Sequence, residues 1–250
     1  DATGPRREDP KSGSRIVEEA ERIPECVPPA CILPHGSMGN SPAGIACDQT
    51  DGKFGPFKNQ LFIAEQTASQ VQRVSLEQVN GVYQGACFPF LSGFKSGNVA
   101  IRFGEDGILF NGGTSRGWGS RGGSNFALER VNWTGKVPLE MLHVSAKPDG
   151  FEITFTQPAD FATLKDLASY NAKAYTYIYQ SNYGSPVVDK LTPTVTKATP
   201  NSDGLSVRIT LDQLTKGHVH ELRLPGVKSA KGFPLLHPVA YYTLNQIPDD

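Results

Sequence analysis

The sequence has no long apolar segment, almost no net charge and only four cysteines. No hydrophobic run approaches the roughly 20 residues that cross a bilayer as a helix, so we expect no membrane span. A formal net charge of −1 argues against a general nucleic-acid or anionic-membrane surface. The cysteines form no CxxC or CxxCH pattern, which excludes a zinc ribbon and covalent haem attachment.

The opening segment, DATGPRREDPKSGSR, is polar and charged and has no signal-peptide pattern. We therefore expect it to be an internal cut or a mature terminus. Residues 1–42 are predicted to form a charged, proline-rich leader. A short helical pattern occupies residues 16–22, and the stretch CVPPACILPHG that follows must be extended or turning because proline supplies no backbone donor.

The composition indicates an all-β protein. Hydrophobic residues make up 38% of the chain and charged residues 20%, as in folded soluble domains. The 26 glycines and 19 prolines predict many turns between short strands. In residues 139–250, segments such as GFEITFT and LSVRITL alternate apolar and polar side chains, so we predict a β-sandwich of the immunoglobulin-like kind with one short helix near residues 164–169.

Residues 43–138 contain an internal repeat. Leu61-Phe62 and Leu109-Phe110 lie 48 positions apart, and Arg73-Val74 and Arg130-Val131 lie 57 apart. The difference is a glycine-rich insertion in the second unit. A period of this length with several strands per unit is typical of β-propeller blades, and Asp106-Gly107 predicts a hairpin within the second one. Because propellers close with about 4–8 blades, these roughly two blades need further blades or partner chains.

The two units and the segment after them resemble the C-terminal part of a bacterial family of large periplasmic propellers, the glucose/sorbosone-dehydrogenase-like proteins found in planctomycete-type bacteria. The resemblance covers residues 30 to 138, and the segment after residue 138 looks like the Ig-like domain that follows those propellers. The stretches that carry it are AGIACDQTDGKFGPFKNQLFIAEQT, RVSLEQVNGVYQGACFPF, FGEDGILFNGGTSRGWGSRG and ERVNWTGKVP, followed by KPDGFEITFTQPAD and HVHELRLPGVKSAKG.

The resemblance implies a non-autonomous part of a larger redox assembly in the periplasm or outside the cell. Soluble quinoprotein sugar dehydrogenases use a histidine and an aspartate from early blades, with pyrroloquinoline quinone and calcium. Those blades are absent from this sequence, so no catalytic residue is assigned, and any sugar or alcohol oxidoreductase activity would lie outside this chain. Expected partners are the remaining blades or other subunits, with a c-type cytochrome among the candidates. The alternatives are a structural subunit of a cell-envelope complex and a carbohydrate-binding module.

The glycine-rich loop at residues 112–123 is the main candidate for ligand binding. Arginines can clamp a carboxylate or phosphate, a tryptophan can stack on a planar ring, and glycines allow close backbone approach. The candidates are Arg116, Trp118 and Arg121, with Arg102 on the preceding strand. The alternative is a connecting loop whose arginines pair with nearby carboxylates and whose tryptophan fills a gap.

Two side-chain patterns in the second half of the sequence are further candidate sites. Tyr175, Tyr177 and Tyr179 alternate along a predicted strand, where they would stack on sugar rings or, as we favour, pack on the sheet. His218 and His220 point to one face of a strand, but no third metal ligand is near in sequence, so we favour two hydrogen-bonded histidines at the core edge.

The four cysteines are predicted to form two disulfides, Cys47–Cys87 and Cys26–Cys31, consistent with an oxidising compartment. The first would close a loop of about 40 residues and the second a very short loop around two prolines. Four reduced, buried cysteines are the alternative.

Overall fold

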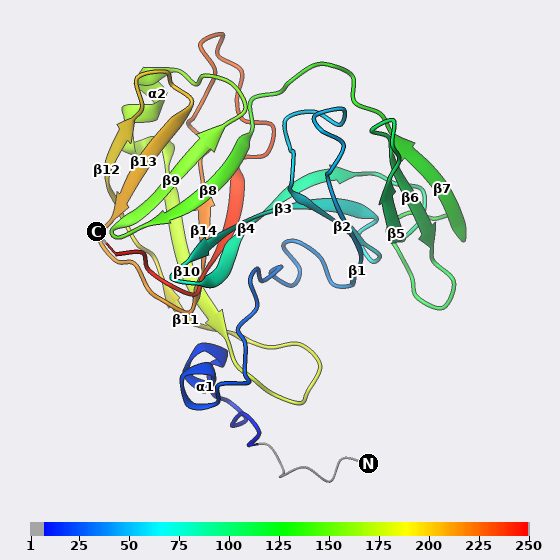
Figure 1. Ribbon diagram of the computed structural model, residues 1–250, viewed down its shortest axis with the longest axis horizontal. Coiled ribbons are helices and arrows are strands. Elements are labelled where there is room, and N and C mark those ends of the chain that lie inside the picture. Colours follow the sequence, from blue (N-terminus) through cyan, green and yellow to red (C-terminus); the bar gives the residue numbers. More distant parts are fainter. Residues whose placement is uncertain (1–7, 250) are drawn as a thin grey trace.

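A computed structural model describes residues 8–249, and in this range the chain is mostly β, in three antiparallel sheets (Figure 1). The first seven residues of the predicted leader and Asp250 lie outside the described residues. The eight-stranded sheet has the order β1 (Pro42–Cys47), β2 (Leu61–Glu65), β3 (Gln70–Val79), β4 (Val82–Ser92), β15 (Val239–Leu244), β14 (His218–Arg223), β10 (Asn171–Tyr177) and β11 (Val187–Leu191).

The other two sheets are smaller, and three short helical segments complete the secondary structure. The helical pattern at residues 16–22 and the short helix near residues 164–169 are both confirmed. The four-stranded sheet contains β12 (Val195–Pro200), β13 (Ser206–Leu211), β9 (Gly150–Phe155) and β8 (Met141–Lys147); the three-stranded sheet contains β5 (Asn98–Phe103), β6 (Leu109–Thr114) and β7 (Phe126–Val131); the helices are α1 (Ile16–Arg22), α2 (Phe161–Lys165) and a 3-10 turn (Leu167–Ser169).

The eight-stranded sheet joins the two halves of the sequence. Its first four strands belong to the segment predicted as blades, and its last four to the segment predicted as a separate sandwich. They meet where β4 pairs with β15, with Cys87 opposite Tyr241 and Ala86 opposite Tyr242. The predicted division of the chain at residue 138 therefore does not coincide with a break in the hydrogen-bonded sheet.

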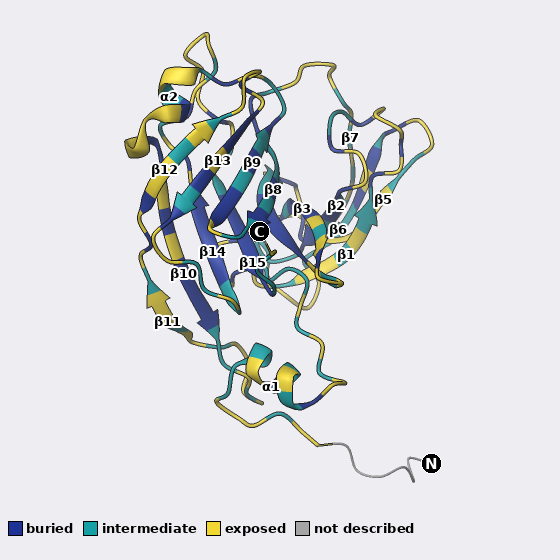
Figure 2. Ribbon diagram, turned by 60° about the vertical axis from the view of Figure 1, so that its left-hand side comes forward, coloured by how far each residue is buried: buried dark blue, intermediate teal, exposed yellow. Residues whose placement is uncertain are grey.

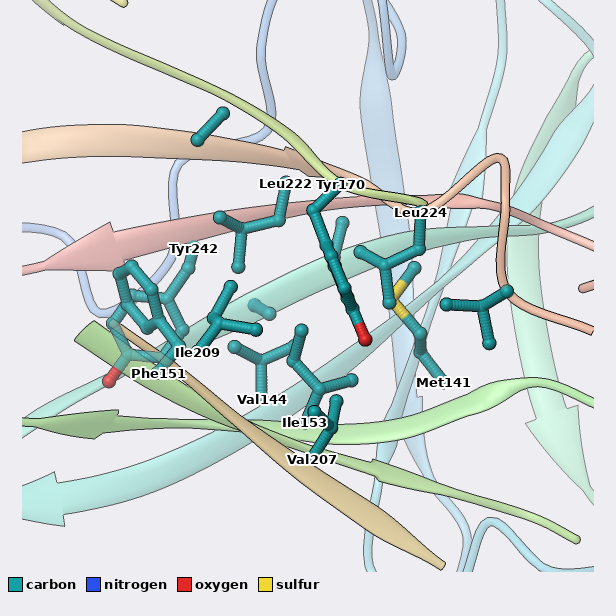
Figure 3. Close-up of a cluster of buried hydrophobic side chains, with 14 of the residues drawn as sticks. Met141, Val144, Phe151, Ile153, Tyr170, Val207, Ile209, Leu222, Leu224 and Tyr242 are labelled. Atoms are coloured by element: carbon teal, nitrogen blue, oxygen red, sulfur yellow. The ribbon is translucent and has the colours of Figure 1, made fainter. Parts of the chain in front are cut away.

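The largest hydrophobic core lies between the four-stranded sheet and the central strands of the eight-stranded sheet (Figure 3). The predicted alternation on β9 is confirmed, because Phe151, Ile153 and Phe155 are all buried. On β13, Val207, Ile209 and Leu211 are buried as expected, whereas Leu205, just before the strand, is 38% exposed. Full burial of each such side chain stabilises the folded state by about 1.5–3 kcal/mol. Figure 2 shows the strands that enclose this core largely in the colour of buried residues.

A second core lies between β1–β4 and the three-stranded sheet. Aromatic rings fill it with edge-to-face contacts, including Phe62 with Phe90 at 5.0 Å and Phe54 with Phe103 at 5.0 Å between centroids. The predicted hairpin between β5 and β6 is confirmed: Gly107 has a φ of +83°, and the Ile108 backbone N–H donates to Asp106 Oδ1. This hairpin and the β6–β7 connection hold three strands against the aromatic cluster.

The opposite face of the eight-stranded sheet is covered by the leader. Met38 is fully buried on this face, and Cys31, Ile32 and Leu33 are partly buried beside it. The Ile32 backbone N–H donates to Thr243 Oγ1 at 2.8 Å, which fixes the leader to β15. Residues 31–38 therefore act as a cover over one side of the sheet, without forming a strand of their own.

Arg73 is buried where the two cores meet. It lies between Phe62 and Phe88 in one cross-strand row, and its guanidinium carbon is 4.6 Å from the Phe57 ring centroid and 4.1 Å from that of Phe88. Phe57 belongs to the second core and Phe88 to the largest one. The guanidinium also donates to the carbonyls of Met141 at 2.6 Å and Leu142 at 3.0 Å, which connects β3 to β8.

Replacing Arg73 by methionine is expected to lower the free energy of unfolding by about 2–4 kcal/mol. Methionine keeps most of the side-chain volume but leaves the Met141 and Leu142 carbonyls without their charged donor. Urea denaturation measures the change. Arg130, the repeat equivalent of Arg73, is exposed, so Arg130→Met should change the stability by less than about 0.5 kcal/mol. Equal losses in the two variants would contradict this role of Arg73.

Candidate functional site

The glycine-rich loop is anchored through its backbone, with its candidate side chains directed outward. The Arg121 N–H donates to the Thr67 carbonyl at 2.8 Å, and Gln66 Nε2 donates to the Trp118 carbonyl at 3.1 Å. Trp118 is 79% exposed, so it does not fill a gap, and Arg116 is exposed too. Arg121 borders a polar depression of about 510 Å³ between this loop and the leader.

Arg102 lies away from this loop. It shares a cross-strand row with Phe110 and Arg130, and Phe110 lies four residues along β6 from Thr114, where that strand ends. It borders a different depression, of about 590 Å³, near the β5–β6 hairpin. The predicted arginines therefore do not converge on one ligand.

This arrangement does not fit pyrroloquinoline quinone, whose several carboxylates require cations that converge on one planar molecule. The described residues also contain no cluster of three or more histidine, cysteine, aspartate or glutamate side chains placed to hold a metal such as calcium. We therefore assign neither group to residues 8–249.

The three predicted tyrosines have very different environments. Tyr175 is only 8% exposed, Tyr177 is half-buried against it with ring centroids 5.9 Å apart, and Tyr179 is exposed. Burial raises the pKa of Tyr177. The first two border a depression of about 420 Å³ that His35 and other leader residues also line. The row does not form one open stacking platform, and this geometry agrees with the packing interpretation.

The two histidines of β14 also differ. His220 is fully buried, 5.3 Å from the Phe151 ring centroid, and burial lowers its pKa to about 3. His218 is half-buried, and its Nδ1 lies 3.2 Å from the Lys216 carbonyl oxygen. No further ligand joins them in the part of the chain that the structure describes. His220 is thus a neutral core residue.

Acid is expected to destabilise the fold through His220. Its folded pKa lies below the unfolded value near 6.5, so between pH 6.5 and about 3 the unfolded state binds one more proton. Stability should therefore be complete above pH 6.5 and fall with decreasing pH, by up to about 1.4 kcal/mol per pH unit from this group. Urea denaturation at several pH values should show a shallower acid slope for His220→Phe, and an unchanged slope would contradict the assignment.

The structure corrects both predicted disulfides, Cys47–Cys87 and Cys26–Cys31. All four cysteines are free, and the sheet register places Cys47 opposite Leu61, Leu61 opposite Val74, and Val74 opposite Cys87. Three steps at about 4.8 Å separate the two backbones by about 14 Å, whereas a disulfide needs less than about 7 Å between Cα atoms. The sequence did not reveal this because spacing says nothing about intervening strands.

An apolar crevice of about 350 Å³, which no sequence pattern indicated, lies beside the segment that joins β7 to β8, with further walls from β4 and the loop at residues 54–57. A buried polar group on its wall is the Glu140 carboxylate, which accepts hydrogen bonds from His237 Nδ1 at 2.5 Å and the His237 N–H at 3.3 Å. Glu140 also interacts electrostatically with the nearby Arg73 cation. The Glu140 carboxylate thus lies near the buried Arg73 cation that it helps to balance, and 97 positions separate Glu140 from its partner His237 in sequence. The crevice walls include Phe54, Phe57, Phe90, Trp133, Val137 and Leu236.

Ser75 and His143 form the one serine–histidine hydrogen bond observed in residues 8–249, at 2.6 Å from Oγ to Nδ1. Burial lowers the pKa of His143, which favours its neutral form. Ser75 is only 5% exposed, however, and lines none of the depressions described above. A nucleophile must reach its substrate, so this pair serves to hold β3 against β8.

The outer face of the three-stranded sheet exposes several large apolar side chains. Phe126 is 81% exposed, Leu128 is 79% exposed and Phe110 is 38% exposed. They lie on the same side of the sheet because Leu128 pairs with Gly112, and Arg130 with Phe110. The outer face is defined here by Ala100, Arg102, Phe110, Gly112, Phe126, Leu128 and Arg130.

No family model, curated protein or solved structure matched the chain. No helix in the described part of the chain is both long enough and apolar enough to cross a bilayer.

Proposed function

We propose that this chain is a non-catalytic assembly module of a larger, secreted, propeller-like protein, in which the outer face of β5–β7 is covered by a further β-sheet. In this proposal β1–β4 and β5–β7 are two blades, and the four-stranded sheet with the second half of the eight-stranded sheet is the Ig-like sandwich. The observation that supports it is the shared register of the two repeat units.

The two repeat units pair their strands in the same way. In the first unit Phe62 lies opposite Arg73, and in the second Phe110 lies opposite Arg130. These are the residues that the 48- and 57-position repeats relate. Because side chains alternate along a strand, both Phe-Arg rows mark the same face of their units.

The corresponding faces of the two units differ in burial, because one is covered by another sheet and the other is exposed. Phe62 of the first unit is fully buried by the second unit, in the core that also contains Leu109. The face of the second unit that carries Leu109 (its leucine face) thus packs against the face of the first unit that carries Phe62 (its phenylalanine face). The second unit's own phenylalanine face carries Phe110 and Arg130 and has no such cover within residues 8–249. Continuing the same stack would bury it under the leucine-type face of a third sheet.

A second copy of this chain does not supply the cover. Its leucine-type faces are already buried, Leu109 by the first unit and Leu61 beside the leader. Two copies meeting through their outer faces would oppose Arg102 and Arg130 of one with the same cations of the other. The occupant is therefore a β-sheet of another polypeptide segment with an aliphatic face.

The sugar-dehydrogenase resemblance supports the propeller-like arrangement and a periplasmic or extracellular location, but the proposal gives this chain no catalytic step. The arginines that would hold a quinone do not converge, and the tyrosines are largely packed. Assembly with the remaining blades or other subunits, including a c-type cytochrome, stays a prediction from the resemblance.

Hydroxyl-radical footprinting tests the covered face. The protein is isolated from its source under native conditions and compared with the same chain produced alone. Oxidation of Phe126 and Leu128 should be several-fold lower in the native assembly because a sheet excludes water from them. Tyr83, which is 59% exposed at the far hairpin of β3–β4, provides an internal control whose oxidation should not change.

A matched pair of variants separates docking from folding. Leu128→Lys in the source organism should abolish co-purification of the assembly, whereas Tyr83→Lys should leave it intact. Both variants should unfold at the same urea concentration as the unmodified chain, since both sites are exposed. Equal oxidation of Phe126 and Leu128 in the two preparations would contradict the proposal, as would an intact assembly with Leu128→Lys.

A further inference from the structure

The thiols of Cys31 and Cys87 meet beneath the leader. Cys87 is fully buried on β4, and Cys31 is partly buried in the same cluster. Both thiols donate to one acceptor, the Ile32 carbonyl oxygen, with sulfur–oxygen distances of 3.9 Å for Cys31 and 3.5 Å for Cys87. After burial, the neighbouring Cys31 thiol is the next cause that raises the pKa of the Cys87 thiol. Fifty-six positions separate them in sequence.

The other two cysteines are placed differently. Cys47 lies on β1, three strands across the sheet from Cys87, and no contact of Cys26 with another cysteine is seen in the described residues. Neither belongs to the cluster that holds Cys31 and Cys87. The fold thus brings one cysteine pair together, and it is not one that sequence spacing favoured.

We propose that Cys31 and Cys87 form a redox-sensitive disulfide that fastens the leader to the sheet. The oxidant is a small-molecule or protein disulfide. The Cys31 thiolate, at the more accessible sulfur, attacks it and releases one thiol, leaving a mixed disulfide on Cys31. The Cys87 thiolate then attacks the Cys31 sulfur and releases the second thiol. In total, two protein thiols are oxidised to one disulfide and one external disulfide is reduced to two thiols.

The disulfide would fasten residues 31–38, which cover one face of the eight-stranded sheet. Residues 31–38 lie over Val74, Tyr175 and Tyr241, and His35 lines the depression beside Tyr175 and Tyr177. With reduced thiols this cover is held by side-chain packing and single hydrogen bonds such as that from Ile32 to Thr243. The disulfide would make its attachment to β4 covalent, so the oxidation state would control how readily this face of the sheet opens.

Burial raises the pKa of Cys87, so the attack of the Cys87 thiolate on the mixed disulfide should be slow near neutral pH and faster in mild base.

Mass spectrometry under non-reducing conditions tests the pairing. The tryptic peptide of residues 23–53 contains Cys26, Cys31 and Cys47, so the whole chain cannot assign the bond from peptide masses alone. The double variant Cys26→Ser/Cys47→Ser retains only Cys31 and Cys87. After incubation with oxidised glutathione it should lose about 2 Da and yield this peptide joined to residues 74–95. Oxidation should also raise its melting temperature by roughly 5–10 °C, because the bond closes a long loop.

The complementary variant, Cys31→Ser/Cys87→Ala, retains Cys26 and Cys47 and should show neither the joined peptides nor the increase in melting temperature. Fragmentation of the joined peptides from the unmodified protein provides a second measurement that does not depend on any variant. The proposal is overturned if the first double variant keeps two free thiols or carries two glutathiones after oxidation. It is also overturned if Cys87 of the unmodified protein is found bonded to Cys26 or Cys47.

Discussion

The stacked guanidinium of Arg73 is the interaction on which the arrangement of the sheets depends. Phe88 on one side of it belongs to the core beneath the four-stranded sheet, and Phe57 belongs to the core beneath the three-stranded sheet. Its hydrogen bonds reach β8, and the Glu140 carboxylate supplies a compensating charge. A buried cation is costly unless its donors are used and its charge is balanced, so these partners must come together for the fold to form.

The eight-stranded sheet is shared by all parts of the fold, and different segments pack on its two faces. One face carries both smaller sheets, and the leader covers part of the other. The three-stranded sheet buries one face in the second core and leaves its outer face exposed, with Phe126 and Leu128 open to water. Exposed apolar surface of this kind usually marks an interaction site. The equivalent face of the first unit, which carries Phe62, is buried by the three-stranded sheet.

Local features could be predicted from the sequence because they depend on short-range chemistry. The α1 helix, the Asp106-Gly107 hairpin and the alternation on β9 and β13 are of this kind. The pairing of β4 with β15 was not predictable, because it joins segments more than 150 positions apart with no pattern specific to each other. For the same reason, no sequence pattern indicated the Glu140–His237 pair or the proximity of Cys31 to Cys87. The candidate arginines are near one another in sequence, but they lie at two ends of the three-stranded sheet.

We propose that a third sheet continues the stack formed by the first two units. The most direct measurement is an electron cryomicroscopy structure of the native assembly that contains this chain. We expect a β-sheet of another segment packed on the outer face, with aliphatic side chains against Phe110 and Leu128. A structure in which this face is open to solvent, or is covered by a second copy of the same face, would contradict it.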